Sequence, residues 1–347
     1  MLDKFKEWGC AIYIGFNSIE FDEEFLRNSF FQNLQNPYYT QINGNQRADA
    51  LNIARASSVF HPTSLKILDV KKQFSLENLA KANNIDHSNA HDAMADVETT
   101  IDICRIIKKK APELWIRSLK TSSKNDVSNY VQDRDILCHH EAYYGKVYTY
   151  VTTHIGSYQN QNKAEINLFF DLKRDPRELL DLNRAELKQL NSDSKTKFLR
   201  TRRFNRHPIF MEKDYAMSFP QYESIGMNEL NQRANILKNN HDFKMKVLDW
   251  HQDENENFEQ KESQLDPFWE ESLYSMGFAS NKDKILMEKF HASDWSQKNI
   301  ISEEFEQEGF KYFAKKIIYE HDSSLLLDNC LLYTSDAADE EDSVDLG

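Results

Sequence analysis

Residues 87–99 read HSNAHDAMADVET, and this stretch carries the pattern on which the interpretation of the chain depends. Ser88 and Asn89 are residue types that cap helices, and the residues after them favour a helix over about 90–110. His91 then lies at the mouth of this helix, and Asp96 lies five residues further on, about one and a half turns into it. A histidine and a carboxylate so placed can face one point in solvent, with a metal-activated water between them.

A second stretch, GFNSIEFDEEFLR at residues 15–27, has the same character. It overlaps the short apolar run AIYIGF at 11–16, which predicts a buried strand. The turn over 17–22 leads into a helix expected over 22–34. Asp22 therefore stands just after a strand, at a helix start, where its carboxylate can point outward from the sheet edge.

Either motif alone is more often structural than catalytic. Acids such as Asp22 are favoured in the first turn of a helix, and His91-Asp92 could simply be a cap. The two motifs in this order, about seventy residues apart, are far more specific than either one.

The first part of the chain, residues 1–118, alternates between strand and helix and predicts an α/β domain. Further helices are expected at 48–59, closed by His61-Pro62, and at 75–82. In the helix at 90–110 the apolar face is expected to comprise Ala93, Val97, Ile101, Cys104 and either Ile107 or Ile106.

The hydrophobic period changes to two from about residue 143, so residues 119–225 predict a small, mostly β domain. Its strands are expected at 146–153, 165–172 and 195–204, with a helical insert near Leu187. Helical spacing returns over 226–329, interrupted by an acidic polar linker or loop at 253–263.

Composition sets broad limits. Apolar residues make up 40% of the chain and aromatic residues 12%, which excludes global disorder. No run approaches the ~18 apolar residues of a membrane-spanning helix. The four cysteines are scattered without a CxxC pair, which indicates neither a disulfide framework nor a thiolate zinc site and fits a reducing cytoplasm.

The net charge of −13 is concentrated at the C-terminus, because nearly half of it comes from six acids in the last twelve residues. Residues 330–347, CLLYTSDAADEEDSVDLG, resemble the translation of a sequencing-library adapter joined to an interrupted reading frame. A natural acidic tail is the alternative. This segment is left out of the fold argument, and the natural C-terminus is expected to be missing.

The motifs together resemble the DEDD exonucleases of the histidine variety and, within them, bacterial exodeoxyribonuclease I. The resemblance is carried by GFNSIEFDEEFLRN, NPYY, LNIARAS, FSLENLAKANNIDHSNAHDAMADVETT and FNRHPIF. It implies a ribonuclease-H-like exonuclease domain, an SH3-like β domain and a C-terminal helical domain. The implied activity is processive 3′→5′ removal of mononucleotides from single-stranded DNA in repair and recombination.

The resemblance also implies roles for particular residues. Asp22 and Asp96 match metal-holding carboxylates, and His91 matches the general base that deprotonates the attacking water. The expected cofactor is Mg²⁺, two per site, because paired cations about 4 Å apart clamp the attacking and leaving oxygens.

Single-stranded DNA is the expected substrate. Arg27, Tyr38 and Arg55 match positions that contact the strand through phosphate pairing and base stacking, although helix-surface solubility explains Arg55 equally well. The strand at 195–204 begins a run rich in basic residues, and the resemblance favours a groove that tracks the DNA backbone over a solvated face. Its bases are Lys195, Lys197, Arg200, Arg202, Arg203 and Arg206.

The chain departs from the family pattern in two places. The DxE pair that supplies two further metal ligands on the family's first strand has no counterpart, so the chain is expected to begin beyond it. Ser75 stands where the family can place a substrate-reaching arginine. We therefore expect an N-terminally truncated chain with little or no nuclease activity by itself.

Two other readings stay open: a non-catalytic single-stranded-DNA binding module, and an exonuclease acting on short RNA or proofreading substrates. The long additions after residue 143 argue against the second. The resemblance implies one protein partner, the single-stranded-DNA-binding protein with its acidic tail. We expect a monomer with no membrane association.

Overall fold

The structure is a computed structural model that describes residues 1–86, 92–160, 164–259 and 268–325. Its contacts divide the chain into two compact units, Met1–Asp22 with Thr40–Ser263, and Glu23–Tyr39 with Gln264–Gly347. This division does not test the three-domain prediction, which stays a prediction.

The first unit begins with α1 (Leu2–Trp8) and a pair of parallel strands, β1 (Ile12–Gly15) and β2 (Gln46–Asp49). β1 is the strand expected from the apolar run. β2 is polar in sequence, QRAD, and was expected in part as helix. It forms a strand because Arg47 and Asp49 are buried with partners, which a hydrophobic period does not reveal.

Helices follow these strands closely. α2 (Asp22–Gln32) starts at the expected residue and continues into the second unit. The other helices of this part of the chain are α3 (Ala50–Phe60), α4 (Leu76–Asn83), α5 (Ala93–Lys110), α6 (Pro112–Lys120) and α7 (Lys124–Gln132). Ser75 caps α4 by accepting from the backbone N–H of Asn78 at 3.3 Å.

The structure corrects two details of α5. Its N-cap is Asp92, whose carboxylate accepts from the backbone N–H groups of Met94 and Ala95, whereas Ser88 and Asn89 lie outside the described residues. The predicted buried face was also wrong in part, because Ala93, Val97 and Ile101 are exposed. The buried residues are Thr99, Thr100, Ile103 and Ile107. The two threonines can be buried because their hydroxyls donate to backbone carbonyls of the same helix.

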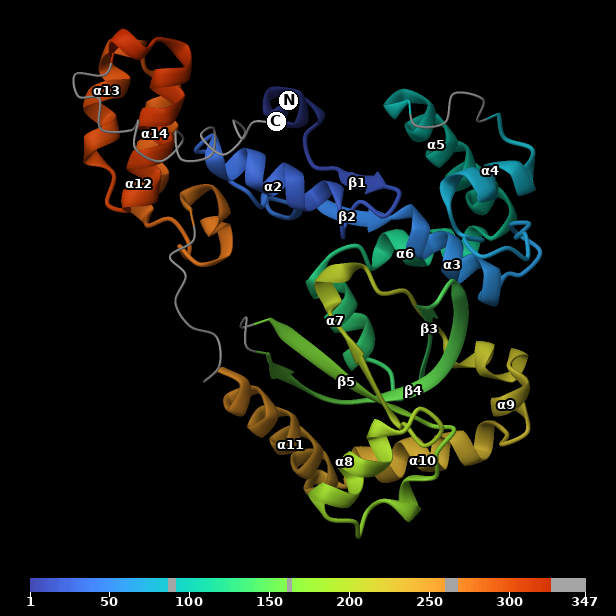
Figure 1. Cartoon of the computed structure of the whole chain (residues 1–347). Helices are drawn as coiled ribbons and strands as arrows, with labels where there is room; N and C mark the ends of the chain where they lie inside the picture. The colour runs from blue at the N-terminus through green and yellow to red at the C-terminus, as the bar shows by residue number, and fades with distance from the viewer. Residues whose placement is uncertain (87–91, 161–163, 260–267, 326–347) are drawn as a thin grey trace, which may run out of the picture. The chain divides into compact units, whose positions relative to one another are not determined.

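A five-stranded antiparallel sheet forms the second half of this unit, in the order β6-β5-β4-β3-β7 (Figure 1). Its strands are β3 (Leu137–Tyr143), β4 (Lys146–Gln159), β5 (Glu165–Asp171), β6 (Leu199–Arg202) and β7 (Phe210–Met211). Three were expected. The short β6 occupies only part of 195–204, because residues 195–198 belong to the turn that connects α8 (Arg184–Ser192) to β6.

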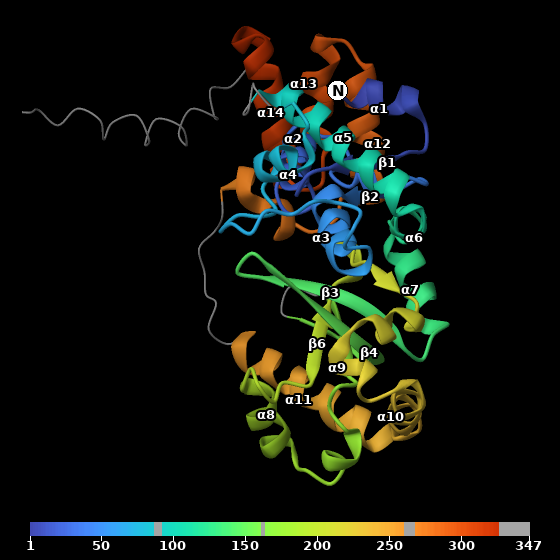
Figure 2. The same ribbon diagram turned by 90° about the vertical axis from the view of Figure 1, so that its right-hand side faces the viewer.

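Hydrophobic side chains cover both faces of this sheet. Phe169 packs with Tyr130 of α7 on one face. Its neighbour Phe170 joins a core on the other face, which also contains Phe243 and Val247. Figure 2 shows α7 and the helices α10 and α11 on different sides of the sheet. This double burial explains why residues 165–171 lack a clean alternation.

The remaining helices of the first unit are α9 (Pro220–Glu223), α10 (Met227–Asn239) and α11 (His241–Glu259). The expected linker at 253–263 was wrong over residues 253–259, where α11 continues. Short 3-10 helices lie at Tyr39–Gln41, Pro176–Glu178, Phe204–Arg206, Lys213–Ser218, Trp269–Tyr274 and Ser323–Leu325.

The second unit is helical. It comprises α12 (Asn281–Ala292), α13 (Trp295–Glu304) and α14 (Glu308–His321), packed with the end of α2. Phe31 of α2 contacts Phe313 of α14 edge-on, with ring centroids 5.0 Å apart. Across the described part of the chain, no helix is both long enough and apolar enough to cross a membrane.

Candidate nuclease site and nucleic-acid contacts

The turn that delivers Asp22 is held by one buried carboxylate, that of Asp49. Asp49 ends β2 opposite Gly15, and its side chain accepts from the backbone N–H groups of Asn17 at 3.0 Å and Ile19 at 3.4 Å. It also caps α3 by accepting from the N–H of Leu51 at 2.9 Å. The turn before Asp22 and the start of α3 are thereby joined through a single side chain.

A segment far along the chain closes over the same turn. Arg206 donates from Nη1 to the carbonyl of Ile19 at 2.9 Å and pairs with Glu20 at 3.1 Å. The next residue, His207, accepts the backbone N–H of Asp49 at Nδ1 over 3.0 Å. We call Asp49, Arg206 and His207 the turn clamp.

Asp49 and His207 of the turn clamp are buried, and burial shifts the pKa of each. Burial raises the pKa of Asp49, while the backbone N–H groups that its carboxylate accepts lower it. Burial lowers the pKa of His207 to about 4, against the bond from its ring to the Ser118 carbonyl. His207 is therefore neutral at pH 7, with Nε2–H donating to that carbonyl at 2.9 Å and Nδ1 left as acceptor.

The predicted catalytic residues are placed only in part. Asp22 is exposed at the first residue of α2, and Asp96 is half-buried in the first turn of α5. His91 lies outside the described residues. Within residues 1–86, 92–160, 164–259 and 268–325, no three His, Cys, Asp or Glu side chains gather into a metal site. Carboxylates are ligands that suit Mg²⁺, but the described side chains do not complete a metal site.

Arg27 and Tyr38, predicted to contact DNA, both lie in the second unit. Arg27 is buried in α2, 2.9 Å from Glu24 and 3.2 Å from the hydroxyl of Tyr274. Tyr38 is half-buried, with the Arg27 guanidinium 5.7 Å from its ring centroid. Their DNA role stays a prediction.

Arg55 is half-buried on α3, and its charge acts on Asp49 of the turn clamp. Burial lowers its pKa, and its Nε has no hydrogen-bond partner among the described atoms. Its predicted contact with DNA is likewise untested.

The predicted DNA-binding arginines at residues 200–203 lie in two environments, and the two that belong to β6 are paired. Arg202 lies 2.6 Å from Glu141, and Arg200 lies 3.7 Å from both Glu141 and Asp171. The guanidinium of Arg200 also stacks on Tyr150 at 3.9 Å. These two arginines are thus largely occupied in buried ion pairs, so their predicted DNA contact would compete with those pairs.

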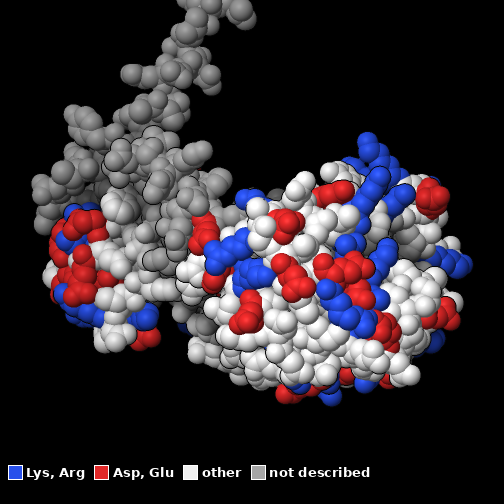
Figure 3. Space-filling view, turned by 90° about the horizontal axis from the view of Figure 1, so that it is seen from below, with Lys and Arg blue, Asp and Glu red and all other residues white. Residues whose placement is uncertain are grey.

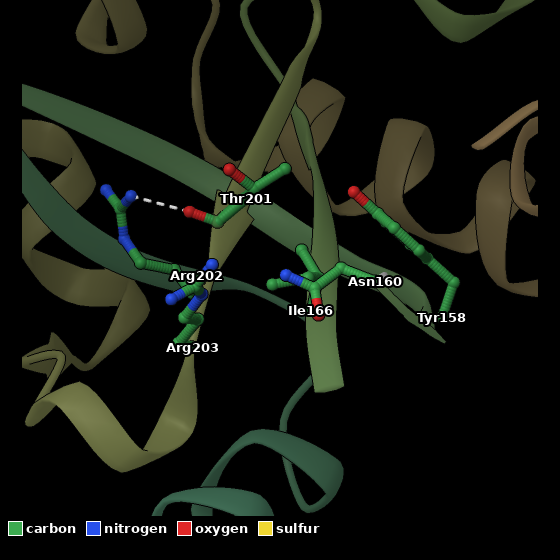
Figure 4. A pocket seen from close by; sticks show the side chains of 6 residues that line it. All are labelled: Tyr158, Asn160, Ile166, Thr201, Arg202 and Arg203. Atoms are coloured by element: carbon green, nitrogen blue, oxygen red, sulfur yellow. Dashed lines mark hydrogen bonds between the residues drawn. The ribbon is translucent and has the colours of Figure 1, made fainter. Parts of the chain in front are cut away.

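Arg203 is exposed and lines a shallow pocket of about 270 Å³ at the sheet edge (Figure 4). Tyr158 and Thr201 lie on the same pocket, and Arg202 turns to the Thr201 carbonyl, 2.7 Å from Nη1. Of the three predicted arginines of this segment, Arg203 is the one whose charge has no ion pair among the described residues.

The face of the first unit formed by α8, α10 and α11 lacks the concentration of positive charge that is typical of a polyanion-binding surface. Figure 3 shows basic and acidic side chains intermingled there. Pairs such as Arg184 with Asp249 at 2.7 Å account for this mixture. A nucleic-acid contact is better sought elsewhere on the unit.

Sequence reasoning missed the turn clamp. The string FNRHPIF was used for the resemblance, yet nothing in it shows that Arg206 and His207 reach residues near the start of the chain. Asp49 had a weak signal, as an acid in the first turn of the helix expected over 48–59.

Comparisons with known proteins agree with this picture. The family model described as Exonuclease (RNase_T) matches residues 1–104, the range that contains Asp22, His91 and Asp96. The chain is 34% identical over 175 residues to exodeoxyribonuclease I of Buchnera aphidicola subsp. Acyrthosiphon pisum, an alignment that covers 49% of this chain and 42% of the relative. It is 41% identical over 106 residues to exodeoxyribonuclease I of Escherichia coli K12, covering 29% and 22%. The resemblance to bacterial exodeoxyribonuclease I is confirmed.

Solved structures share the fold. Escherichia coli exonuclease I in complex with a dA16 oligonucleotide matches with a TM-score of 0.71 at 22% identity, covering 92% of this chain and 70% of the other. A structure of SSB/exonuclease I with the inhibitor CFAM matches with a TM-score of 0.68 at 22% identity, covering 92% and 68%. The predicted α/β class is confirmed, while the SH3-like character of the β half is not specifically shown. The chain spans less than half the length of the curated relatives it matches.

Proposed function

We propose that this chain carries the substrate-handling and part of the catalytic apparatus of a 3′→5′ exonuclease that degrades single-stranded DNA. The observation that carries the proposal is the exposed Asp22, presented by a turn that the clamp holds from two sides. A surface acid that only solvates a helix needs no such support. The match of residues 1–104 to an exonuclease family supports the same conclusion.

In this proposal Asp22 and Asp96 hold a divalent cation, Mg²⁺ by preference, which when bound supplies charge stabilisation for phosphodiester hydrolysis. His91 takes the proton of the attacking water. The turn clamp keeps Asp22 in position without a contact to the substrate. A first-strand DxE pair is needed to complete the set of ligands.

The test uses two proteins: the 347-residue chain, and the same chain joined to a DxE-bearing first strand from a relative. We expect the first to bind single strands but to show little turnover. The second should release mononucleotides from the 3′ end in the presence of Mg²⁺ and not in EDTA. Release from the 5′ end, or equal digestion of blunt duplex, would contradict the proposal.

Two substitutions in the extended protein assign the roles. Asp96→Asn should abolish turnover while leaving DNA binding nearly intact, because it removes a metal-holding charge and no phosphate contact. His91→Ala should lower the rate roughly 10²–10⁴-fold, with partial recovery at higher pH. Asp102→Asn is the matched control, because it makes the same substitution at a solvent-exposed side chain of the same helix, α5.

A non-catalytic single-stranded-DNA binding module is the second candidate for the chain alone. It is favoured by the lack of any three-ligand metal cluster within the described ranges. Binding of single strands without turnover, even after the DxE strand is added, would select it.

The proposed protein partner is the single-stranded-DNA-binding protein, through its acidic tail. This partner is supported by the similar solved structure of SSB/exonuclease I in complex with the inhibitor CFAM. A labelled peptide of the acidic tail should bind the chain with micromolar or better affinity, and more weakly as salt is raised. No binding at low salt would remove this partner.

A further inference from the structure

The hairpin that joins β3 to β4 has an unusual residue at its tip. Its two turn residues, Tyr144 and Gly145, both have positive φ values, 51° and 79°. Such a turn favours Asn-Gly, because asparagine and glycine tolerate the left-handed conformation. Gly145 fits this requirement, whereas a tyrosine at the first position is strained.

No packing in the described part of the chain compensates for this strain. The relative exposure of Tyr144 is 105%, so its ring packs against none of the residues that the structure describes. A large side chain kept in an unfavourable turn position, without packing, points to a role outside the fold.

Two further tyrosine rings lie beside the tip. Tyr143 and Tyr148 are each 45% exposed, and their ring centroids are 6.3 Å apart. The hydroxyl of Tyr143 is bonded to Glu141, a buried acid that is already paired with Arg202. The hairpin therefore presents three aromatic faces, and the acid beneath them is neutralised.

Three lysines lie on the two chain segments that meet at this tip, Lys146 opposite Tyr143 in the hairpin and Lys71 and Lys72 in the segment against Gly145. The tip is fixed to residues 71–73, because Gln73 donates from Nε2 to the Gly145 carbonyl at 2.5 Å and a Cβ on Gly145 would lie 3.0 Å from the Lys71 carbonyl. Lys71, Lys72 and Lys146 are exposed, and none of them has an ion pair among the described residues. Their charges are free to meet an anionic ligand.

We propose that this tyrosine hairpin surface, made of Tyr143, Tyr144, Tyr148, Lys71, Lys72 and Lys146, binds single-stranded DNA. Bases stack on the exposed rings, and phosphates contact the lysines. Unpaired bases are required, because the faces of bases inside a duplex are already stacked. The proposal rests on the proposed function and extends it, since the predicted DNA contacts include none of these residues.

The turn itself supplies a sharp test. Tyr144→Asn removes the ring and places a better residue in the left-handed position, so the melting temperature should stay the same or rise. Binding of the 347-residue chain to a labelled dT16 strand, measured by fluorescence anisotropy in EDTA, should weaken about 5- to 150-fold, the worth of one stacked base. Tyr144→Phe should retain wild-type binding. Tyr319→Ala, which removes an exposed tyrosine on α14, is the control.

The lysines are tested by salt. Replacing Lys71, Lys72 and Lys146 with glutamine should reduce the slope of log K against log salt by roughly 2, at about 0.7 per phosphate contact on a single strand. If the wild type binds dT16 and Tyr144→Asn binds it with the same affinity, this inference is overturned and the proposed function still stands. Absence of single-strand binding by the wild type would overturn both. Loss of self-association in Tyr144→Asn, with DNA binding unchanged, would assign the surface to a second copy of the chain instead.

Discussion

At the scale of single residues, the Asp49 side chain joins two separate segments of the backbone. One carboxylate accepts backbone N–H groups from the turn before Asp22 and from the start of α3. Because the carboxylate is buried, its removal would take away the acceptor that each of these N–H groups has within the described residues.

Asp49→Ala should therefore lower the free energy of unfolding by about 2–4 kcal/mol, combining the loss of a cap with unsatisfied buried donors. Asp49→Asn should lose less, since its amide oxygen can still accept. Urea unfolding measures both, and Asp69→Asn, at an exposed position, provides the control. A change below 0.5 kcal/mol in Asp49→Ala would show that the turn does not depend on this residue.

His207 should make stability depend on pH. Above pH 6.5 it is neutral in both the folded and the unfolded chain. Below 6.5 the unfolded chain takes up a proton that the folded chain refuses until about pH 4. Its stabilising effect is thus complete above pH 6.5 and is lost as the pH falls towards 4, by roughly 3 kcal/mol at most.

Urea unfolding at pH 7 and pH 4.5 should show this loss in the wild type and a shallower pH slope in His207→Asn. His139 and His140 also have lowered pKa values because they are buried, so both proteins retain some slope. Equal slopes in the two proteins would contradict the assignment.

At the scale of elements, the arginines at residues 200–203 show that neighbouring charges of one sign can have different roles. Arg200 and Arg202 of β6 point to one face of the sheet and meet Glu141 and Asp171, whereas Arg203, one residue past the end of β6, is exposed. A basic run in a sequence does not reveal such pairing, because its partners lie on other strands.

Arg202→Met should lower the free energy of unfolding by about 3 kcal/mol, because it leaves the Glu141 carboxylate buried without its closest cation. Arg203→Gln should change stability by less than about 0.5 kcal/mol and weaken single-strand binding. The comparison needs urea unfolding and dT16 anisotropy on both variants. If Arg202→Met proves as stable as the wild type, the ion pair has no structural role.

At the scale of the whole first unit, residues far apart in the chain hold the candidate site. Arg206 reaches the carbonyl of Ile19, and Arg47 donates to the carbonyl of Asn205 at 3.1 Å. The α/β part that carries Asp22 and Asp96 and the β part that follows it are therefore joined at the turn that presents Asp22.

Arg206→Met should loosen that turn without unfolding the sheet. Amide hydrogen exchange should become faster in a peptide covering residues 15–21 and stay unchanged in β4 and β5. Arg203→Gln is the control from the same segment. Uniform acceleration across the unit would instead show that Arg206 supports global stability.

The amino-acid sequence by itself determined the strand at β1, the starts of α2 and α4 and three strands of the antiparallel sheet, because local patterns encode each of them. It also identified Asp22, His91 and Asp96 as candidate site residues, whose roles stay predictions. It did not determine β2, the buried face of α5 or the surroundings of Arg200 and Arg202. Those features depend on partners from other elements. The same reason applies to the clamp: Asp49 and His207 are 158 residues apart, and only the tertiary structure brings their hydrogen-bonding groups together.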